Sequence, residues 1–224
     1  MGKQIILVSG RHVHEIEEYA KELMLSEGDF IISCDGQYIY THDFKCLWVN
    51  KFLKKKDLLW IYNNVAKIFK IITNQSDYRV YYKKKPYNNV DIDNKKCLSF
   101  FDLIFFSQKD IEKVIVYIKK ENINPLLMAN YTVHCYENVV EILNMNVNKF
   151  IALEQLCSMA KIESLDSCVY FGDDYNDYEC FVNMNNCIAM ATAPDALKSR
   201  SIFVTKDSDN SGVGFAVDEI MKRE

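Results

Sequence analysis

Short, continuous apolar runs that end in small polar loops constrain this chain more than any other feature. The first run covers residues 4–8 and ends in Ser9-Gly10-Arg11, and residues 13–25 then carry apolar side chains at helical spacing. A buried strand, a loop of small residues and a helix form half of a βαβ unit. We therefore expect an α/β fold with a parallel, Rossmann-like sheet.

The same pattern returns towards both ends of the chain. We expect further strands at 29–33, 168–171, 187–190 and 201–204, and helices at 149–161, 194–199 and 212–222. The sequence CDGQYIYT, from Cys34 to Thr41, predicts a turn followed by another strand.

The middle of the chain has a different character, because strands and helices do not simply alternate there. We expect helices at 57–72 and 108–121, and strands at 78–83, 98–106, 126–129 and 131–136. Such a mixture indicates an α+β insertion. The predicted organisation is a core built from 1–46 and 143–224, with an inserted cap at 47–142.

Composition argues against several classes of protein. The formal net charge of −4 gives no basic field for nucleic acid, and no apolar run approaches the roughly 20 residues that span a bilayer. The opening residues lack a signal-peptide pattern. The eight cysteines contain no C-x-x-C pair, and free thiols suit a reducing cytoplasm. We expect a cytoplasmic protein without nucleic-acid or membrane partners, and the sequence does not indicate its oligomeric state.

Three carboxylates lie within five residues directly after the predicted strand 168–171. They belong to Asp173, Asp174 and Asp177, at the strand end where open α/β sheets bind ligands. Their mutual repulsion would be relieved by a hard cation such as Mg²⁺, which prefers oxygen ligands. The alternative is a solvated helix N-terminus, where acidic residues favour the helix dipole.

Two further features indicate an anion site. Ser9-Gly10-Arg11 offers a hydroxyl, backbone N–H groups and a guanidinium at a helix N-terminus, although Ser-Gly is also an ordinary helix cap. Lys149 begins a predicted helix, where a cation opposes the dipole. That position requires either a compensating anion or exposure to solvent.

Taken in order, these segments resemble the haloacid dehalogenase (HAD) superfamily, and more narrowly its Cof-type phosphatases of cap subclass IIB. The matching segments are S-G-R, then V-N-K-F-I-A-L-E-Q-L after a long insertion, then Y-F-G-D-D-Y-N-D. FIISCDGQYIY is similar to a hairpin of that family, and CIAMATAPDALKSRSIFVTKDSDNSGVG is similar to its C-terminal segment. Thr192-Ala193 and Asp35-Gly36 depart from the usual Asn-Ala and Asn-Gly.

The resemblance implies a Mg²⁺-dependent phosphatase that acts on sugar phosphates or similar small phosphorylated metabolites. In this comparison Ser9 would bond the transferring phosphoryl group, and Lys149 would neutralise its charge. Asp173 would bind Mg²⁺, and Asp177 would support the metal shell. The residues implied at the substrate phosphate are Ser9, Gly10, Arg11 and Asn176.

One motif of the family is absent from the printed sequence. The family uses an aspartate nucleophile in D-x-D-G-T, which does not occur in the printed sequence, and we expect the D-x-D at Asp91-Ile92-Asp93 in a surface loop of the cap. In the resemblance, the absent strand lies at the sheet centre, between the strands that end at Ser9 and Gly172. The chain would then pair those strands directly, borrow a strand, or be a fragment, because unpaired buried backbone groups are costly.

Three hypotheses follow. The first is a phosphatase whose nucleophile is encoded upstream of Met1, the second is a non-catalytic pseudoenzyme that binds phosphate or sugar phosphates, and the third is an inactive gene fragment. Two other interpretations have less support. A zinc site built from the histidines lacks convergent spacing (His12, His14, His42 and His134). The aromatic and basic stretch at 81–87 could form a nucleic-acid patch, but a cap edge strand protected by lysines is the favoured interpretation. The same stretch could equally face the active site and help to hold an anionic substrate.

Overall fold

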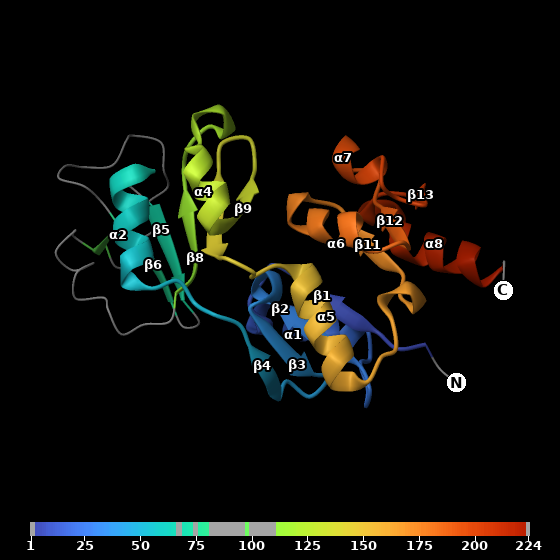
Figure 1. Cartoon of the computed structure of the whole chain (residues 1–224). Coiled ribbons are helices and arrows are strands. Elements are labelled where there is room, and N and C mark those ends of the chain that lie inside the picture. Colours follow the sequence, from blue (N-terminus) through green and yellow to red (C-terminus); the bar gives the residue numbers. More distant parts are fainter. Residues whose placement is uncertain (1–2, 66–68, 74–75, 81–96, 99–110, 223–224) are drawn as a thin grey trace. The chain divides into compact units, whose positions relative to one another are not determined.

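The structure is a computed structural model that describes residues 3–65, 69–73, 76–80, 97–98 and 111–222. The chain forms two compact units (Figure 1). The first unit contains Met1–Trp48 and Asn148–Glu224, and the second contains Val49–Val147. The predicted stretch 81–87, Asp91-Ile92-Asp93 and most of the strand predicted at 98–106 lie outside the described residues.

The first unit begins with a four-stranded sheet in the order β1-β2-β3-β4. Its strands are β1 (Ile6–Val8), β2 (Phe30–Ser33), β3 (Tyr38–Thr41) and β4 (Cys46–Val49). β1 and β2 are parallel and are joined through helix α1 (Val13–Glu22), whereas β2 and β3 form an antiparallel pair around the turn η1 (Cys34–Gly36). These elements confirm the predicted strands, helix and turn, while β4 was not predicted.

The rest of the first unit forms a second, parallel sheet in the order β11-β12-β13. The strands are β11 (Tyr170–Gly172), β12 (Cys187–Ala189) and β13 (Phe203–Val204). The helices are α5 (Lys149–Ala160), α6 (Tyr178–Asn183), α7 (Asp195–Lys198) and α8 (Gly212–Met221). The three strands and the helices α5, α7 and α8 were predicted within a few residues, because each apolar run here is bounded by turn residues.

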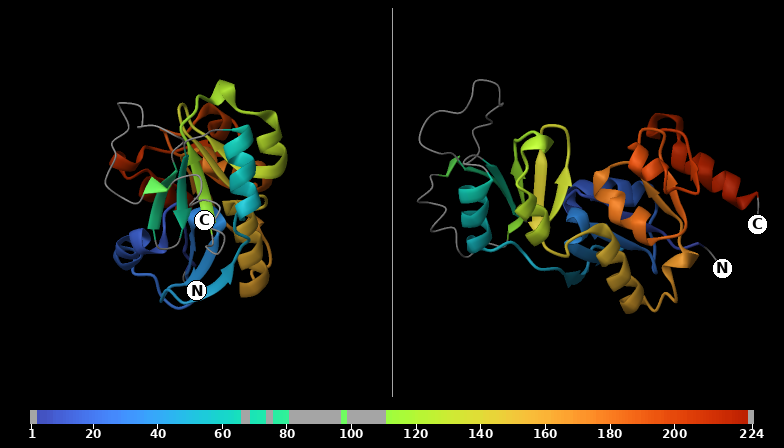
Figure 2. Two further views of the ribbon diagram at one scale, coloured as in Figure 1. Left: turned by 90° about the vertical axis from the view of Figure 1, so that its left-hand side faces the viewer. Right: turned by 45° about the horizontal axis from the view of Figure 1, so that its top comes forward.

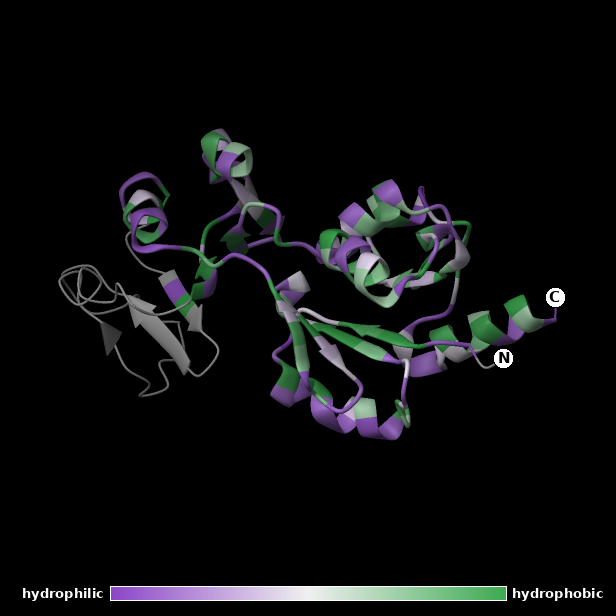
Figure 3. Cartoon of the chain, turned by 60° about the horizontal axis from the view of Figure 1, so that its bottom comes forward, coloured by the Kyte–Doolittle hydropathy of each residue, from purple (hydrophilic) through white to green (hydrophobic). Residues whose placement is uncertain are grey.

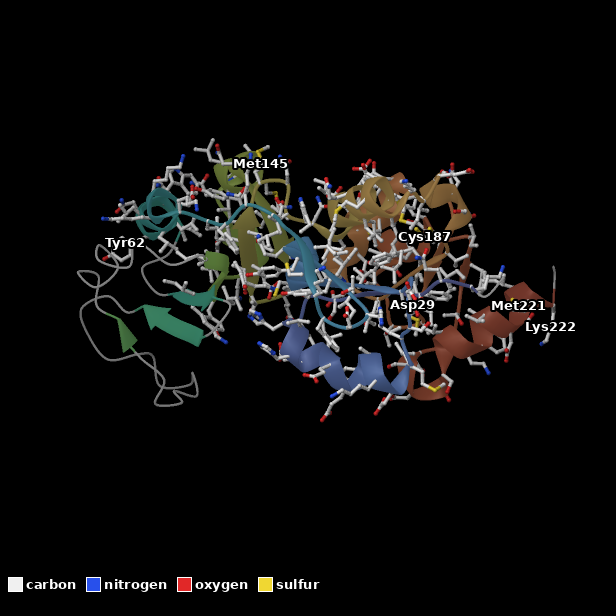
Figure 4. The ribbon with its side chains drawn as sticks, turned by 90° about the horizontal axis from the view of Figure 1, so that it is seen from below. Asp29, Tyr62, Met145, Cys187, Met221 and Lys222 are labelled. Atoms are coloured by element: carbon white, nitrogen blue, oxygen red, sulfur yellow. The ribbon has the colours of Figure 1, made fainter. Side chains whose placement is uncertain are left out.

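One hydrophobic core joins the two sheets of the first unit. It contains Ile32 and Ile39 from the first sheet, Leu156 from α5, and Tyr170 and Ala189 from the second sheet. Figure 4 shows α5 and α6 on one side of the strands and α1 and α8 on the other. Figure 3 shows hydrophobic segments recurring along α8, the last helix before the C-terminus. Within the described residues, β1 pairs with β2 and β11 pairs with β12, but β1 and β11 do not pair with each other.

The second unit is a six-stranded sheet covered on one face by two helices (Figure 2). The sheet order is β7-β6-β5-β8-β10-β9. The strands are β5 (Phe69–Thr73), β6 (Ser76–Val80), β7 (Cys97–Leu98), β8 (Ile111–Val116), β9 (Tyr131–Cys135) and β10 (Val140–Asn144), and the helices are α2 (Lys55–Asn64) and α4 (Pro125–Asn130). The core between helices and sheet contains Leu58, Leu127, Val114 and Ile142.

The helix predicted at 108–121 is wrong over its described part, because residues 111–116 form the strand β8. Ile111, Val114, Ile115 and Ile118 have the spacing of a helix, which explains the error. β-Branched side chains favour strands, and β8 pairs with β5 on one edge and β10 on the other. A central position in a sheet therefore overrides the local periodicity.

Two more predictions in the second unit need correction. The helix predicted at 57–72 ends at Asn64, and Phe69–Thr73 is the strand β5. The strand predicted at 126–129 is the helix α4, whose Asn124 side chain accepts a hydrogen bond from the N–H of Leu126 at 3.0 Å. Asn at the N-cap followed by Pro125 at the first helical position is a helix start signal that the apolar run obscured. None of the described helices has the length and apolarity needed to cross a membrane.

Candidate active site

The loop after β1 holds the first group of predicted site residues. The N–H of Ser9 donates to the carbonyl of Ile32 at 2.9 Å, and the Ser9 hydroxyl accepts from the N–H of Arg11 at 3.1 Å. The Ser9 hydroxyl hydrogen therefore remains able to donate to a ligand. At Gly10, an added Cβ would lie 2.7 Å from Oδ1 of Asp35 and 3.2 Å from Nδ2 of Asn176. Only glycine lets these loops approach so closely.

Asp35 is a central residue of this site, and sequence reasoning missed it. It is fully buried in η1, between Cys34 and Gly36, and all three residues have positive φ angles of 50°, 56° and 95° in chain order. Its N–H donates to the carbonyl of Ser9 at 3.1 Å, and its Oδ1 accepts from Nδ2 of Asn176 at 2.8 Å. The Asp-Gly pair that signals such a turn was visible in the sequence, but its partner was not.

A buried ion pair connects the start of α5 with the loop after β11. Nζ of Lys149 lies 2.7 Å from Oδ1 of Asp177, and the residues are only 6% and 2% exposed. The hydroxyl of Tyr170 also donates to Oδ1 of Asp177 at 2.7 Å. Oδ2 of Asp177 accepts from the N–H groups of Asp173 at 2.9 Å and Asp174 at 3.1 Å. Asp177 thus ties together α5, β11 and the loop that follows it.

Charge and burial set the protonation of this cluster. Burial alone would lower the pKa of Lys149, but the nearby carboxylates of Asp177 and Asp35 raise it above its ordinary value. Burial and the charge of Asp177 also raise the pKa of Tyr170 well above its usual range. Lys149 therefore carries its positive charge and Tyr170 keeps its proton. The compensating anion that a lysine at a helix N-terminus requires is present.

The three clustered carboxylates have different surroundings. Both oxygens of Asp177 already accept two hydrogen bonds each, which fills the capacity of a carboxylate. Asp174 accepts from the N–H of Tyr175 at 2.7 Å as a helix cap. Asp173 is the most exposed of the three, and partial desolvation of its carboxyl group together with the charge of Asp177 raises its pKa. Asp173 is thus the carboxylate best placed to bind a cation, with Asp177 in support behind it.

Arg11 lies at the edge of the site. Its Nη1 donates to the hydroxyl of Tyr19 at 3.2 Å, and the guanidinium lies 5.6 Å from the centre of the Tyr19 ring. Both contacts hold the Arg11 side chain along α1.

Hydrogen bonds join most of the predicted site residues of the first unit into two branches, which are linked through the adjacent residues Asn176 and Asp177. One branch runs from Ser9 through Asp35 to Asn176, and the other runs from Lys149 through Asp177 to Asp173. The loop of Tyr175–Asp177 carries members of both branches. Ser9 thus follows the carboxyl end of β1 and Asp173 follows the carboxyl end of β11, while Lys149 is bonded to Asp177 in the same segment as Asp173.

Comparison with known proteins relates this arrangement to one family. The family model for haloacid dehalogenase-like hydrolases matches residues 1–217. The chain is 24% identical over 240 residues to the putative phosphatase YxeH of Bacillus subtilis (strain 168). That alignment covers 98% of this chain and 86% of YxeH. It is also 37% identical over 86 residues to the 5-amino-6-(5-phospho-D-ribitylamino)uracil phosphatase YwtE of the same organism. That alignment spans 38% of this chain and 29% of YwtE.

Solved structures show the same fold. The HAD subclass IIB sugar phosphatase BT4131 matches with a TM-score of 0.75 at 16% identity, covering 98% of this chain and 86% of that one. SMU.1108c from Streptococcus mutans UA159 matches with a TM-score of 0.75 at 17% identity, covering 97% and 85%. The sequence, the fold and the family model agree, and the chain belongs to the haloacid dehalogenase-like hydrolases.

Proposed function

We propose that this protein is a Mg²⁺-dependent phosphatase of small phosphorylated metabolites. The observation that supports this proposal is the placement of Ser9 after β1 and of Asp173 after β11, with the charged Lys149 bonded to Asp177 beside Asp173. Phosphoryl transfer needs positioning and positive charge around the transferring group rather than extensive covalent chemistry by the protein.

Each residue has a defined task in this proposal. The Ser9 hydroxyl donates to a phosphoryl oxygen, while its own oxygen is positioned by the N–H of Arg11. Lys149 places a positive charge beside the phosphoryl group, and Asp177 and Tyr170 hold that lysine in place. Asn176, fixed by Asp35, lines the substrate phosphate together with Gly10 and Arg11.

The donor set fits a magnesium ion. Asp173 would supply a carboxylate oxygen, and oxygen ligands are those that Mg²⁺ prefers. When bound, the ion would neutralise charge on the phosphoryl oxygens. Asp177 would act through Asp173 and Lys149 rather than as a direct ligand, because its oxygens are occupied.

The nucleophile of the reaction would come from outside the printed sequence, which contains no D-x-D-G-T. Expression from a reading frame extended upstream of Met1 tests this directly. We expect the extended protein to hydrolyse p-nitrophenyl phosphate with Mg²⁺ and to lose that activity with a chelator. Sugar phosphates and phosphorylated ribityl compounds form the substrate panel, following the names of BT4131 and YwtE. An extended protein without hydrolysis under any of these conditions would contradict the proposal.

A second candidate is a non-catalytic protein that binds phosphate or sugar phosphates, favoured by the same absent motif. Calorimetry on the chain as printed, with Mg²⁺ and with sugar phosphates, separates the candidates. Binding without turnover by both the printed and the extended chain supports the second candidate, and no binding at all argues against it.

A reducing cytoplasm is the proposed location. The support is chemical: among the described residues, no disulfide joins Cys34, Cys46, Cys135, Cys157, Cys168, Cys180 or Cys187.

A further inference from the structure

A thiol and an imidazole meet beside the loop that follows β1. Sγ of Cys34 lies 3.3 Å from Nδ1 of His12, although the two residues are 22 positions apart in the sequence. Cys34 is 2% exposed, and His12 is half-buried. Neither residue has a task in the proposed function. The pair is therefore a separate group of metal-ligating and nucleophilic side chains in the first unit.

The backbone fixes the position of both partners. The N–H of Cys34, in the turn η1, donates to the carbonyl of Arg11 at 2.9 Å. His12 immediately precedes α1, where its N–H donates to Oε2 of Glu15 and its carbonyl accepts from the N–H of Glu15, both at 3.0 Å. These bonds hold η1 against the start of α1 through main-chain atoms. The thiol and the imidazole thus face each other in a preformed arrangement.

Other described cysteines have different partners. Sγ of Cys46 lies 3.6 Å from the carbonyl oxygen of Trp48, and Sγ of Cys187 lies 3.5 Å from that of Cys180. A carbonyl oxygen accepts a hydrogen bond from a thiol, but it is a hard ligand. Cys34 instead lies next to an imidazole nitrogen. A thiolate together with an imidazole is a ligand pair that zinc prefers.

The separation of the two atoms is close to that of two ligands on one tetrahedral ion. Zinc lies about 2.3 Å from a thiolate sulfur and about 2.0 Å from an imidazole nitrogen, so tetrahedral angles place these atoms about 3.5 Å apart. The distance between Sγ of Cys34 and Nδ1 of His12 is 3.3 Å. An ion can therefore replace the proton between the two side chains with little movement of either one.

Burial favours the same exchange. A thiolate as buried as Cys34 would be costly by itself, because a buried charge needs a partner. A divalent cation supplies that partner, and the proton shared by the thiol and the imidazole is released when the ion binds. The soft ligand pair also selects against Mg²⁺, which prefers oxygen ligands such as the carboxylate of Asp173.

We propose that Cys34 and His12 form a binding site for a soft divalent metal ion of the zinc type. The side chains supply one thiolate and one imidazole, and water completes the coordination. Because Cys34 bonds to the backbone of Arg11, the ion would lie beside the loop Ser9-Gly10-Arg11 and join it to η1. This site is chemically distinct from the proposed magnesium site, and it does not depend on the proposed function.

Cobalt is the spectroscopic probe, because a thiolate bound to Co²⁺ gives an intense charge-transfer absorption that oxygen ligands do not give. Titration of the full printed chain with Co²⁺ should produce this band, with saturation at one equivalent. Zn²⁺ should abolish the band, whereas a large excess of Mg²⁺ should leave it unchanged. Cys34→Ser should remove the band, and His12→Gln should weaken Co²⁺ binding by at least about tenfold.

Two neighbouring residues provide matched controls. Cys46→Ser removes an exposed cysteine, and His14→Gln removes an exposed histidine of α1. Both variants should keep the band and the Co²⁺ affinity of the parent protein. A band that persists in Cys34→Ser, a band that either control removes, unchanged affinity in His12→Gln, or no band at all would each overturn the inference.

X-ray absorption by Zn²⁺ bound to the parent protein needs no substitution, and it decides the question if Cys34→Ser fails to fold. We expect one sulfur at about 2.3 Å and at least one imidazole among the zinc ligands. A zinc environment without sulfur, or with two or more sulfurs, would reject Cys34 and His12 as the site. None of these measurements uses phosphatase activity, so their outcome is independent of that of the proposed function.

Discussion

At the scale of single residues, burial decides how much an ion pair contributes. Lys149 and Asp177 are 2.7 Å apart and buried, whereas Lys222 and Glu219 are 2.8 Å apart with the Lys222 side chain 70% exposed. Removal of one partner of a buried pair leaves an uncompensated charge, while exposed pairs contribute little.

We therefore expect Lys149→Met to lower the free energy of unfolding by about 3–5 kcal/mol, measured by urea denaturation. Lys222→Met is the matched control, and its free energy of unfolding should remain close to that of the parent protein. The double variant Lys149→Met/Asp177→Asn should recover much of the loss, because it removes the orphaned charge. A single Lys149→Met variant as stable as the parent would contradict the role of this pair.

Gly10 and Gly214 make a second matched comparison. At Gly10 an added methyl group would meet Asp35 at 2.7 Å, while at Gly214 it would meet nothing within 4 Å. We expect Gly10→Ala to lower the free energy of unfolding by about 1–3 kcal/mol, because the added methyl group overpacks the site. Gly214→Ala, in the helix α8, should be neutral or stabilising by up to about 1 kcal/mol. Thermal unfolding of the two variants measures both effects, and equal melting temperatures would contradict the close approach at Gly10.

At the scale of elements, Asp29 fixes the start of β1 against the turn before β2. Its carboxylate accepts from the N–H of Ile5 at 2.7 Å and from the N–H of Ser26 at 2.8 Å. Burial raises the pKa of Asp29, but these hydrogen bonds outweigh that effect and lower it below its ordinary value. The ionised form is thus favoured in the folded protein.

The sign of the pH dependence follows from that lowered pKa. A carboxylate with a depressed folded pKa contributes stability above its unfolded pKa of about 4, and this contribution is lost as pH falls through the folded pKa. Asp29→Asn should cost on the order of 1–2 kcal/mol at neutral pH. Denaturation across pH should show the difference from the parent shrinking below about pH 4. Asp209→Asn, at an exposed position, is the control. A stability difference between Asp29→Asn and the parent protein that grows as the pH falls would contradict this account.

The strand β8 shows how far an element can be predicted from its own residues. Its apolar residues fit a helical period, so the local pattern predicted a helix there. Pairing with β5 and β10 made it a strand instead. By contrast, β1, α1 and β2 were predicted correctly, because each is bounded by its own turn and cap residues.

At the scale of the whole molecule, the two units have separate hydrophobic cores. Ile142 belongs to the core of the second unit, and Leu156 to the core of the first. Both are fully buried, so truncation of either to alanine should cost about 2–5 kcal/mol. Because the cores are separate, we expect calorimetry to resolve two unfolding transitions. Ile142→Ala should lower the midpoint temperature of one transition, and Leu156→Ala should lower that of the other. Equal shifts of a single transition by both variants would show that the units unfold together.

The sequence by itself determined the parallel α/β pattern of the first unit and the positions of Ser9, Lys149 and Asp173 at strand and helix ends. Those features depend on apolar spacing, caps and turn residues that act over a few neighbouring positions. Tertiary structure alone decided which side chains meet. Lys149 bonds to Asp177, which is 28 residues away in the sequence, and Asn176 bonds to Asp35, which is 141 residues away. Such contacts form only when distant elements pack around one core, so no local pattern in the chain encodes them.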